Sequence, residues 1–440
     1  MPSLARWWAT LRGDLTGQSE GPVLERNIRL NTLHGMVSVA AANLVGPFVG
    51  IFAVKLEASN LQVALLSSAP AVVSLLSMIP GGKFVDRQRH KKAVTAAFLL
   101  AHRSFYLLMA TIPLFPAPLR PAVLVTAVAL MNLPGAIGNV AWQGFISRIV
   151  PQQRRATAFA ARNRAMNLFG TMVVLLAGRI LDMLGYPFGY QLMFSLAFLV
   201  ALGEIWVFTR LEESEETPPS AQTELAGQRR SILGSIGRDL REIVGYQRFL
   251  RYTLASIFFY FAWQTAWPLF TLYQVKVLGA NNLWVSILSL MNTGGSLVGY
   301  GYWARFMDRH GSLRTLFVST VGIFIVPTVY AFSHSLVTVA VFNLVTGAIF
   351  SGVNLALFNA LLEFTPEDKK TTYIAYYSTA VNASAIFAPM AGVALLNLVG
   401  FFWAFLAAAA LRIMGSLTFF YLGRLERREE ARQNSAAAVS

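Results

Sequence analysis

Uncharged amide and aromatic side chains occur at helical spacing and could together bind a small molecule. Asn139, Trp142 and Gln143 follow the i, i+3, i+4 pattern that places side chains on one face of a helix. Such a face can hydrogen-bond a neutral polar solute through its amides and offer it a flat apolar surface. Amides within apolar helices also hydrogen-bond neighbouring helices, so both roles stay open for this face.

A second group of amides lies beside two prolines in equivalent places. Asn43 and Gln264 each lie four residues before a proline, Pro47 and Pro268 respectively. Tryptophans next to Gln264 add flat apolar surface. Together with the first face, the candidates for solute contact are Asn43, Asn139, Trp142, Gln143, Trp263, Gln264, Trp267 and Asn354.

Ionisable side chains are scarce inside the apolar segments, where their burial is expensive and therefore suggests a function. His34, Asp182 and Glu204 lie in or at the end of such segments and are the candidates for handling a coupling ion. Arg103 and Arg412 lie inside apolar segments as well. The sequence leaves their roles open between an ion pair, a structural contact and snorkelling to the membrane surface.

Several kinds of chemistry are excluded by the residues that are missing. The chain has no cysteine, which excludes disulfides, cysteine-ligated zinc and thiol catalysis. Its five histidines are scattered without metal-ligand spacing, and no zinc-protease, nucleophile-elbow or phosphate-loop motif is present. We therefore expect no enzyme activity, no cofactor and no metal site.

Long apolar runs must position these residues. Of 440 residues, 55% are hydrophobic and 13% are charged, against roughly 25% charged in soluble domains. About 20 apolar residues cross ~30 Å of hydrocarbon, and the sequence predicts an all-α polytopic membrane protein with twelve transmembrane helices. The expected spans are 30–54, 61–81, 93–114, 121–146, 158–181, 188–210, 252–275, 283–304, 314–333, 336–361, 372–397 and 400–422.

The basic charge of the chain follows these spans. The formal net charge is +15, and nearly all of the 36 Lys and Arg lie in the terminal segments or in alternate loops. Because Lys and Arg flank spans on the cytoplasmic side, we expect a multi-pass plasma-membrane protein in the lipid bilayer with both termini cytoplasmic, and no nucleic-acid partner. The six exceptions are Lys55, Arg120, Arg179 and Lys276 on the other side, and Arg103 and Arg412 within spans.

The two halves of the chain carry a repeated pattern. Pro47 and Pro268 are separated by almost the same number of residues as the Asp-Arg pairs in the loops after spans two and eight. A fixed offset of this kind indicates an internal duplication. The repeated loop residues are Gly82, Asp86 and Arg87 in the first copy and Asp308, Arg309 and Gly311 in the second.

The duplication and the longest polar stretch divide the chain into five segments. The expected organisation is a cytoplasmic N-terminal segment (1–26), a six-helix bundle (27–210), a cytoplasmic linker (211–251), a second six-helix bundle (252–423) and a cytoplasmic tail (424–440).

The repeated loops resemble a signature of the major facilitator superfamily of secondary transporters, in which a glycine and an apolar residue precede Asp-Arg and a basic cluster. The first copy departs from it at Arg89, where the family usually has glycine, and the second keeps Gly311 but has Ala304 for the first glycine. The resemblance covers essentially residues 27–423. It implies two pseudo-symmetric six-helix bundles with the substrate site between them and with helices one, four, seven and ten lining the central cavity.

The repeated loops are expected to act as gates at the cytoplasmic side. A carboxylate such as Asp86 or Asp308 can cap a neighbouring helix and pair with arginine only when that side of the two halves is closed. The Gly-Pro signature of many drug/proton antiporters is missing from span five, which runs from Gly170 to Gly178 without proline.

The resemblance implies alternating-access transport of a small organic solute without ATP, with a proton or a sodium ion as the expected coupling ion if transport is coupled. Aromatic and apolar residues without a fixed countercharge favour export of amphipathic or drug-like compounds. Symmetric amides favour uptake of a neutral metabolite such as a sugar or nucleoside. Anionic substrates are disfavoured unless span three turns Arg103 inward. A non-transporting membrane receptor or scaffold is the alternative of another class.

Overall fold

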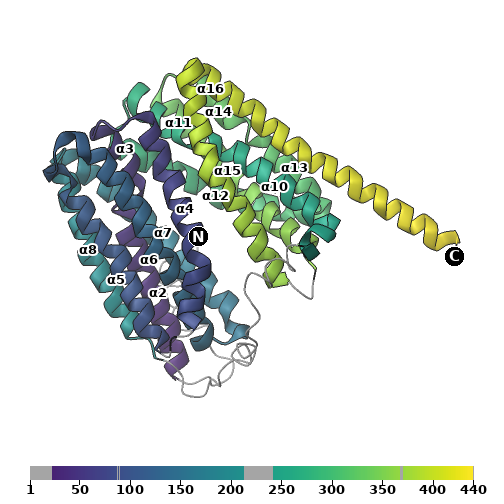
Figure 1. Ribbon diagram of the computed structural model, residues 1–440, viewed down its shortest axis with the longest axis horizontal. Coiled ribbons are helices and arrows are strands. Elements are labelled where there is room, and N and C mark those ends of the chain that lie inside the picture. Colours follow the sequence, from purple (N-terminus) through teal and green to yellow (C-terminus); the bar gives the residue numbers. More distant parts are fainter. Residues whose placement is uncertain (1–21, 87, 89, 213–240, 367–369, 440) are drawn as a thin grey trace, which may run out of the picture.

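The computed structural model describes residues 22–86, 88, 90–212, 241–366 and 370–439. Within these ranges the chain is helical apart from turns and short connections, and it forms no strand. Helices satisfy their own backbone hydrogen bonds, which is what the interior of a bilayer demands. The first half of the chain and the second half form two adjacent helical bundles (Figure 1).

The first bundle contains six spans, the first of which is interrupted. A short 3₁₀ turn with Pro47 near its start separates α2 from α3, because proline removes a backbone donor and disturbs the regular helix. The elements are α2 (Pro22–Asn43), η1 (Gly46–Phe48), α3 (Val49–Lys55), α4 (Asn60–Asp86), α5 (Lys91–Thr111), η2 (Ile112–Leu114), η3 (Ala117–Leu119), α6 (Arg120–Ile149), α7 (Gln152–Leu184) and α8 (Phe188–Thr209).

The second bundle repeats this arrangement, including the interruption of its first span. Pro268 lies near the start of α11, and a π-helical turn follows it. The elements are α10 (Gln247–Thr265), α11 (Trp267–Leu272), η5 (Tyr273–Val277), α12 (Asn282–His310), α13 (Ser312–Gly322), α14 (Ile325–Phe332), α15 (Leu336–Phe364) and α16 (Lys370–Val439).

The helices account for the twelve predicted spans. Nine stretches in the described residues are long and apolar enough to cross a membrane. One of them, Tyr373–Glu429, holds two spans, because the chain turns at Gly400 (φ 75°, ψ 173°) inside α16. The remaining two are the interrupted span of α10 and α11 and the polar-rich α12. The prediction of an all-α membrane protein with twelve spans in two halves is confirmed.

Small residues allow α12 and α15 to pack closely. A Cβ atom added to Gly295 would lie 1.9 Å from the carbonyl oxygen of Leu344, and one added to Gly347 would lie 1.9 Å from that of Asn292. Only glycine fits at such contacts, and close backbone approach is a principal source of helix association in membranes. The second bundle is therefore held together by contacts that leave no room for larger side chains.

The two bundles meet mainly at one end of the molecule. We call the end that carries the loops rich in Lys and Arg the basic end, and the other the opposite end. At the opposite end Lys276 Nζ donates to Asn60 Oδ1 (3.0 Å), and Asn60 Nδ2 donates to Asn397 Oδ1 (3.1 Å). From there the helices of the two bundles diverge toward the basic end (Figure 1).

The last helix extends beyond the membrane-spanning part of the chain. α16 continues to Val439, so the predicted tail is helical through the described residues. Its extension is joined to the start of α10 by two ion pairs, Arg248 Nε to Glu426 Oε2 (2.7 Å) and Arg251 Nη1 to Glu429 Oε1 (2.6 Å). These pairs tie the first and last spans of the second bundle together at the basic end.

Candidate functional site

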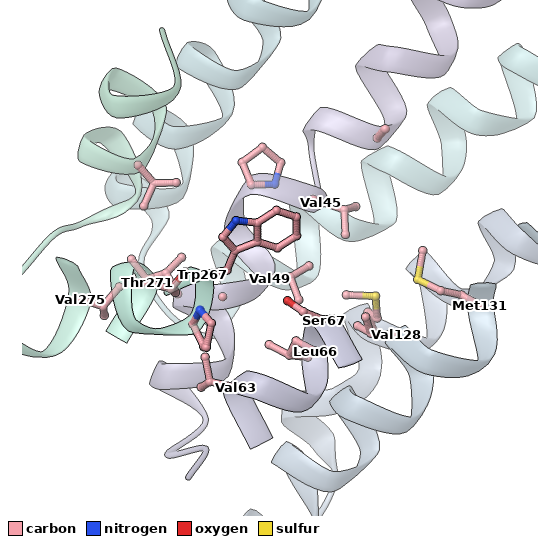
Figure 2. A pocket seen from close by; sticks show the side chains of 18 of the residues that line it. Val45, Val49, Val63, Leu66, Ser67, Val128, Met131, Trp267, Thr271 and Val275 are labelled. Atoms are coloured by element: carbon pink, nitrogen blue, oxygen red, sulfur yellow. The ribbon is translucent and has the colours of Figure 1, made fainter. Parts of the chain in front are cut away.

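A cavity of about 450 Å³ lies between the two bundles, and we call it the central cavity. Its walls are mostly apolar, with Val45, Val49 and Leu66 from the first bundle and Val275 from the second (Figure 2). Trp267 places its indole among these side chains and is 41% exposed, so the ring is available to a ligand. Among the described residues that line it, none is an Asp, Glu, Lys or Arg.

The polar groups of the central cavity are few and uncharged. They are the hydroxyl groups of Ser67, Tyr106 and Thr271 and the amides of Asn132 and Gln274. Apolar walls with a small number of placed polar groups are typical of small-molecule sites, because the walls provide affinity and the polar groups provide orientation.

The two interrupted spans build this cavity. Pro47 and Pro268, which occupy equivalent places in the repeat, both line it. Each proline stands near the start of a short helical piece, so the backbone changes course beside the cavity. Irregular backbone at membrane depth is tolerated where it lines a cavity. The internal duplication thus places its two breaks at one site.

A second cavity of about 490 Å³ lies within the first bundle, and we call it the polar pocket. Arg103 on α5 donates from Nε to Glu204 Oε2 (2.9 Å) and from Nη2 to Glu204 Oε1 (3.2 Å). It also donates from Nη2 to Ser38 Oγ (3.0 Å) and from Nη1 to the hydroxyl group of Tyr106. Arg103 therefore engages a carboxylate through two nitrogens, the strong geometry for such pairs.

Further polar groups surround this ion pair. His34 Nε2 lies 3.7 Å from Glu204 Oε1, and the imidazole stacks on Trp142 with ring centroids 6.4 Å apart. The guanidinium of Arg162 lies over the Trp142 ring, 4.6 Å from its centroid. The buried ring nitrogens of His34 and Trp142 have no hydrogen-bond partner among the described residues.

The two cavities adjoin. Asn132 lines both of them. Tyr106 lines the central cavity, and its hydroxyl group accepts a hydrogen bond from Arg103 in the polar pocket. A side chain from α6 and one from α5 therefore connect the uncharged space between the bundles with the charged space inside the first bundle.

Three predicted solute-contact residues line these cavities. Trp267 lines the central cavity, while Asn139 and Trp142 line the polar pocket. Gln143 and Asn354 are exposed and line neither cavity.

The other three candidates make contacts inside a bundle. Asn43 Nδ2 donates to the carbonyl oxygen of Gly170 (2.9 Å), which joins α2 to α7. Trp263 is buried against Phe259 and Phe350, and Gln264 is also buried. These three side chains line neither cavity. The hydrogen bond of Asn43 is the contact between neighbouring helices that amides in apolar helices also make.

The predicted gating residues that the structure describes lie at the basic end. Gly82 and Asp86 belong to the last turns of α4, and Arg87 lies outside the described residues. Asp308 and Arg309 are exposed in the last turn of α12. Gly311 ends that helix with a φ of 79°, a conformation that favours glycine.

The predicted coupling residues separate into two places. His34 and Glu204 line the polar pocket. Asp182 lies at the opposite end, where its carboxylate accepts hydrogen bonds from the backbone nitrogens of Asn282 (3.0 Å) and Leu283 (2.9 Å) and from Asn282 Nδ2 (2.9 Å). Asp182 of the first bundle thus caps α12 of the second.

Arg412 donates to backbone carbonyl groups, whereas Arg103 forms an ion pair with Glu204. Arg412 is fully buried, and its Nη1 and Nη2 donate to the carbonyl oxygens of Ile323 (3.1 Å) and Trp263 (2.8 Å). Ile323 lies at the break between α13 and α14, where carbonyl groups lack intrahelical donors. The guanidinium therefore satisfies a broken helix, and among the described residues it has no ion-pair partner.

Sequence reasoning missed several cavity residues. Tyr106, Asn132, Thr271 and Gln274 are single polar residues in apolar spans, and no repeat or spacing distinguishes them. Arg162 lies just inside the predicted span 158–181 and belongs to none of the predicted groups; α7 begins at Gln152 and carries this residue to the polar pocket. Within the described residues, no three His, Asp or Glu side chains are placed to hold a metal ion.

Comparison with known families identifies the class of this chain. The family model of the Major Facilitator Superfamily matches residues 33–299 and 252–439. The chain belongs to this superfamily. The superfamily consists of membrane transporters and not of enzymes, so the chain is a multi-pass membrane transporter. No curated protein sequence matches this chain.

Solved structures of other transporters share this fold. A mutant of the nucleoside transporter NupG aligns with a TM-score of 0.70 at 12% identity, covering 89% of this chain and 99% of NupG. A bacterial homologue of the human lysosomal transporter Spinster, inward-facing and unoccupied, gives 0.67 at 13% identity over 92% and 98%. A D-xylose–proton symporter gives 0.64 at 14% identity over 90% and 97%. These likenesses establish the fold.

Proposed function

We propose that this chain exports amphipathic small organic solutes across the plasma membrane by alternating access. The observation that carries the proposal is the central cavity, which both bundles line with apolar side chains and a few uncharged polar groups. A solute with a large apolar part gains free energy by leaving water for such walls, at roughly 25 cal/mol per Å². The indole of Trp267 adds a flat surface for an aromatic ring.

The proposed orientation places the basic end in the cytoplasm. Lys and Arg are concentrated there, as the positive-inside rule requires. The bundles meet at the opposite end and diverge toward the basic end (Figure 1), so the described conformation is inward-facing in this orientation. The gating loops with Asp86 and Asp308 are proposed to approach each other when that side closes.

Transport by purified protein in proteoliposomes tests this function. A neutral amphipathic fluorescent dye should move faster into vesicles that contain the protein than into empty vesicles, because inside-out molecules import what they would export from a cell. Trp267→Ala should slow this movement several-fold because it removes the exposed ring from the central cavity. Trp403→Ala is the matched control, since Trp403 is exposed and does not line the cavity. Equal rates in empty and protein-containing vesicles would refute the proposal.

Uptake of a neutral metabolite is the second candidate. The amides of Asn132 and Gln274 reach the same cavity and can hydrogen-bond the hydroxyl groups of a sugar or nucleoside. Transporters named for nucleosides and for D-xylose share this fold. Counterflow of labelled uridine and of labelled xylose in the same vesicles distinguishes this candidate from the dye exporter.

Coupling to a proton or a sodium ion is proposed to involve the polar pocket. Glu204 and His34 are the ionisable coupling candidates that line it, and the carboxylate of Glu204 is 2.9 Å from Arg103. Dye movement should then respond to a pH or sodium gradient imposed across the vesicle membrane. The same gradients applied to empty vesicles provide the control.

A further inference from the structure

Counted over the described residues, the lining of the polar pocket carries one more positive than negative charge. Its lining includes two guanidinium groups, Arg103 and Arg162, and one carboxylate, Glu204. Glu204 is already engaged with Arg103 through both oxygens. With the histidines neutral, the positive charge of Arg162 therefore remains without a carboxylate of its own among the described residues.

Arg162 is poorly satisfied for a buried arginine. Its side chain is only 9% exposed, yet among the described residues it donates a single hydrogen bond, from Nε to the carbonyl oxygen of Asn31 (3.3 Å). The Trp142 ring beneath it supplies a cation–π contact, worth about 2 kcal/mol when desolvated. A buried charge costs considerably more than that unless it is paired.

Neighbouring groups also lack hydrogen-bond partners. The buried Nε1 of Trp142 has none among the described residues, and an indole nitrogen can only donate. Both ring nitrogens of His34, a side chain 3% exposed, are unpartnered as well. His34, Trp142 and Arg162 all line the polar pocket. The pocket therefore presents donors that need an acceptor, next to an uncompensated positive charge.

A carboxylate satisfies both needs. It carries one negative charge and only accepts hydrogen bonds, and its two oxygens match the fork of a guanidinium. A neutral hydroxyl or amide group would leave the charge of Arg162 uncompensated. The sequence alone disfavours an anionic substrate because it shows no basic pair facing a cavity, but the structure places Arg103 and Arg162 on one pocket.

We propose that the polar pocket binds the carboxylate of an amphipathic solute whose apolar part occupies the central cavity. Asn132 lines both cavities, so one molecule can extend from the first to the second. Arg162 is the residue that recognises the charge, and Trp142 donates to the same group. This inference rests on the proposed function, since it names the class of solute that the transporter accepts.

Binding of a matched pair of probes tests the inference. The full chain in lipid nanodiscs is titrated with 4-phenylbutyrate and with 4-phenylbutyramide, which differ in charge but hardly in shape, and binding is measured by calorimetry and by the shift in Tm. The carboxylate should bind wild type at least about tenfold more tightly than the amide, as a charge-assisted bidentate hydrogen bond provides.

Two arginine variants of α7 separate recognition from general charge. Arg162→Gln should lose the preference for the carboxylate, whereas affinity for the amide should change less than about twofold. Arg164→Gln, which changes an exposed arginine of the same helix, should keep the preference. Without ligand, Arg162→Gln should have a Tm no lower than that of wild type, because it removes an unpaired buried charge.

The outcomes distinguish this inference from the proposed function. Equal affinity of wild type for the two probes, or an unchanged carboxylate preference in Arg162→Gln, would overturn the inference, while dye transport could still support export. Absence of binding by either probe would contradict the inference as well. Loss of the preference in Arg162→Gln alone, with normal binding of the amide, supports it.

Discussion

At the scale of single residues, the most consequential interaction is the ion pair inside the first bundle. Glu204 is 1% exposed, and it binds Arg103 through two hydrogen bonds while His34 lies 3.7 Å away. Taking two charges out of water is costly, and breaking such a pair by removing one partner is costlier than never forming it. Arg103 and Glu204 are therefore expected to depend on each other for stability.

Glu204→Gln should lower the free energy of unfolding by about 3–5 kcal/mol, because it leaves both guanidinium groups of the polar pocket without a carboxylate. The double variant Arg103→Met with Glu204→Leu should recover most of this loss, since it removes the charge of Arg103 together with that of its partner. Thermal unfolding of both proteins in nanodiscs measures the difference. Glu25→Gln is the control, because it removes only an exposed ion pair with Arg29 (3.7 Å), worth about 0–1 kcal/mol. A Glu204→Gln protein as stable as wild type would contradict the expectation.

The sequence predicts which side chains share a face, but not what covers that face. Asn139 and Trp142 were predicted together and both line the polar pocket. Asn43 has the same chemistry, yet its amide is taken by the carbonyl oxygen of Gly170 on a neighbouring helix. Helical spacing is local information, whereas access to a cavity depends on the packing of helices far apart in the chain.

At the scale of helices, the contact between α7 and α12 holds the opposite end closed. Asp182 caps the start of α12, where the helix dipole favours a negative charge. Ser286 of α12 donates to the carbonyl oxygen of Val174 on α7 (2.8 Å), and Tyr190 of the neighbouring α8 donates to Asn282 Oδ1 (2.6 Å). Alternating access requires these contacts between the bundles to break together.

Asp182→Asn should shift the protein toward a conformation open at the opposite end, because an amide is a weaker acceptor than a carboxylate for the donors of α12. A loss of about 1.4 kcal/mol corresponds to a tenfold change in the ratio of the two states. The chain has no cysteine, so Ser67→Cys in the central cavity can be labelled with an impermeant maleimide from either side. Labelling from the opposite end should increase in Asp182→Asn and stay unchanged in Glu57→Gln. Equal labelling in all three proteins would argue against the closed contact.

Gly178→Leu should prevent closure of the same end by steric conflict. A Cβ atom at this position would lie 2.2 Å from Ser286 Oγ and 2.7 Å from the carbonyl oxygen of Asn282. The same labelling of Ser67→Cys measures the effect, and we expect strong reaction from the opposite end. Gly423→Ala, where a Cβ atom meets nothing within 4 Å, serves as the control. If Gly178→Leu were labelled only as much as the wild-type protein, α7 and α12 would not need to approach so closely.

Helix existence could be predicted from composition, while helix interruptions could be predicted only in part. The twelve spans follow from apolar length, and the breaks at Pro47 and Pro268 follow from proline chemistry. The break between α13 and α14 ends at Phe324, before Pro327, and its carbonyl group at Ile323 is satisfied by Arg412 from the last span. No local pattern links residues so distant in the sequence.

At the scale of the whole molecule, the two bundles are joined at one end, and the proposed alternating access requires them to separate there. Asn60 donates to Asn397, and both side chains are short, so the backbones of the two bundles are close at this point. A covalent link at the same place would hold the opposite end closed while leaving the basic end free.

Cross-linking Asn60→Cys to Asn397→Cys with a short thiol-specific reagent should reduce transport at least about tenfold, the change expected when one of two alternating states is nearly removed. Cleaving the link with a reductant should restore it. Each single cysteine variant treated with the same reagent is the control. Continued transport by the fully cross-linked protein would mean that the opposite end does not need to open.

The buried arginines of the two bundles make different contacts and do not occupy equivalent places in the repeat, since Arg103 lies in the third span and Arg412 in the last. Among the described residues, the Arg412 guanidinium donates to backbone carbonyl groups and lies over the Phe270 ring, whereas Arg103 holds a carboxylate beside a ligand-sized space. In the described part of the chain, the charged groups that line a cavity lie in the first bundle, whereas both bundles supply the apolar walls of the central cavity. We therefore expect substitutions in the first half to change the preference of the transporter for the charge of its substrate more than substitutions in the second half do.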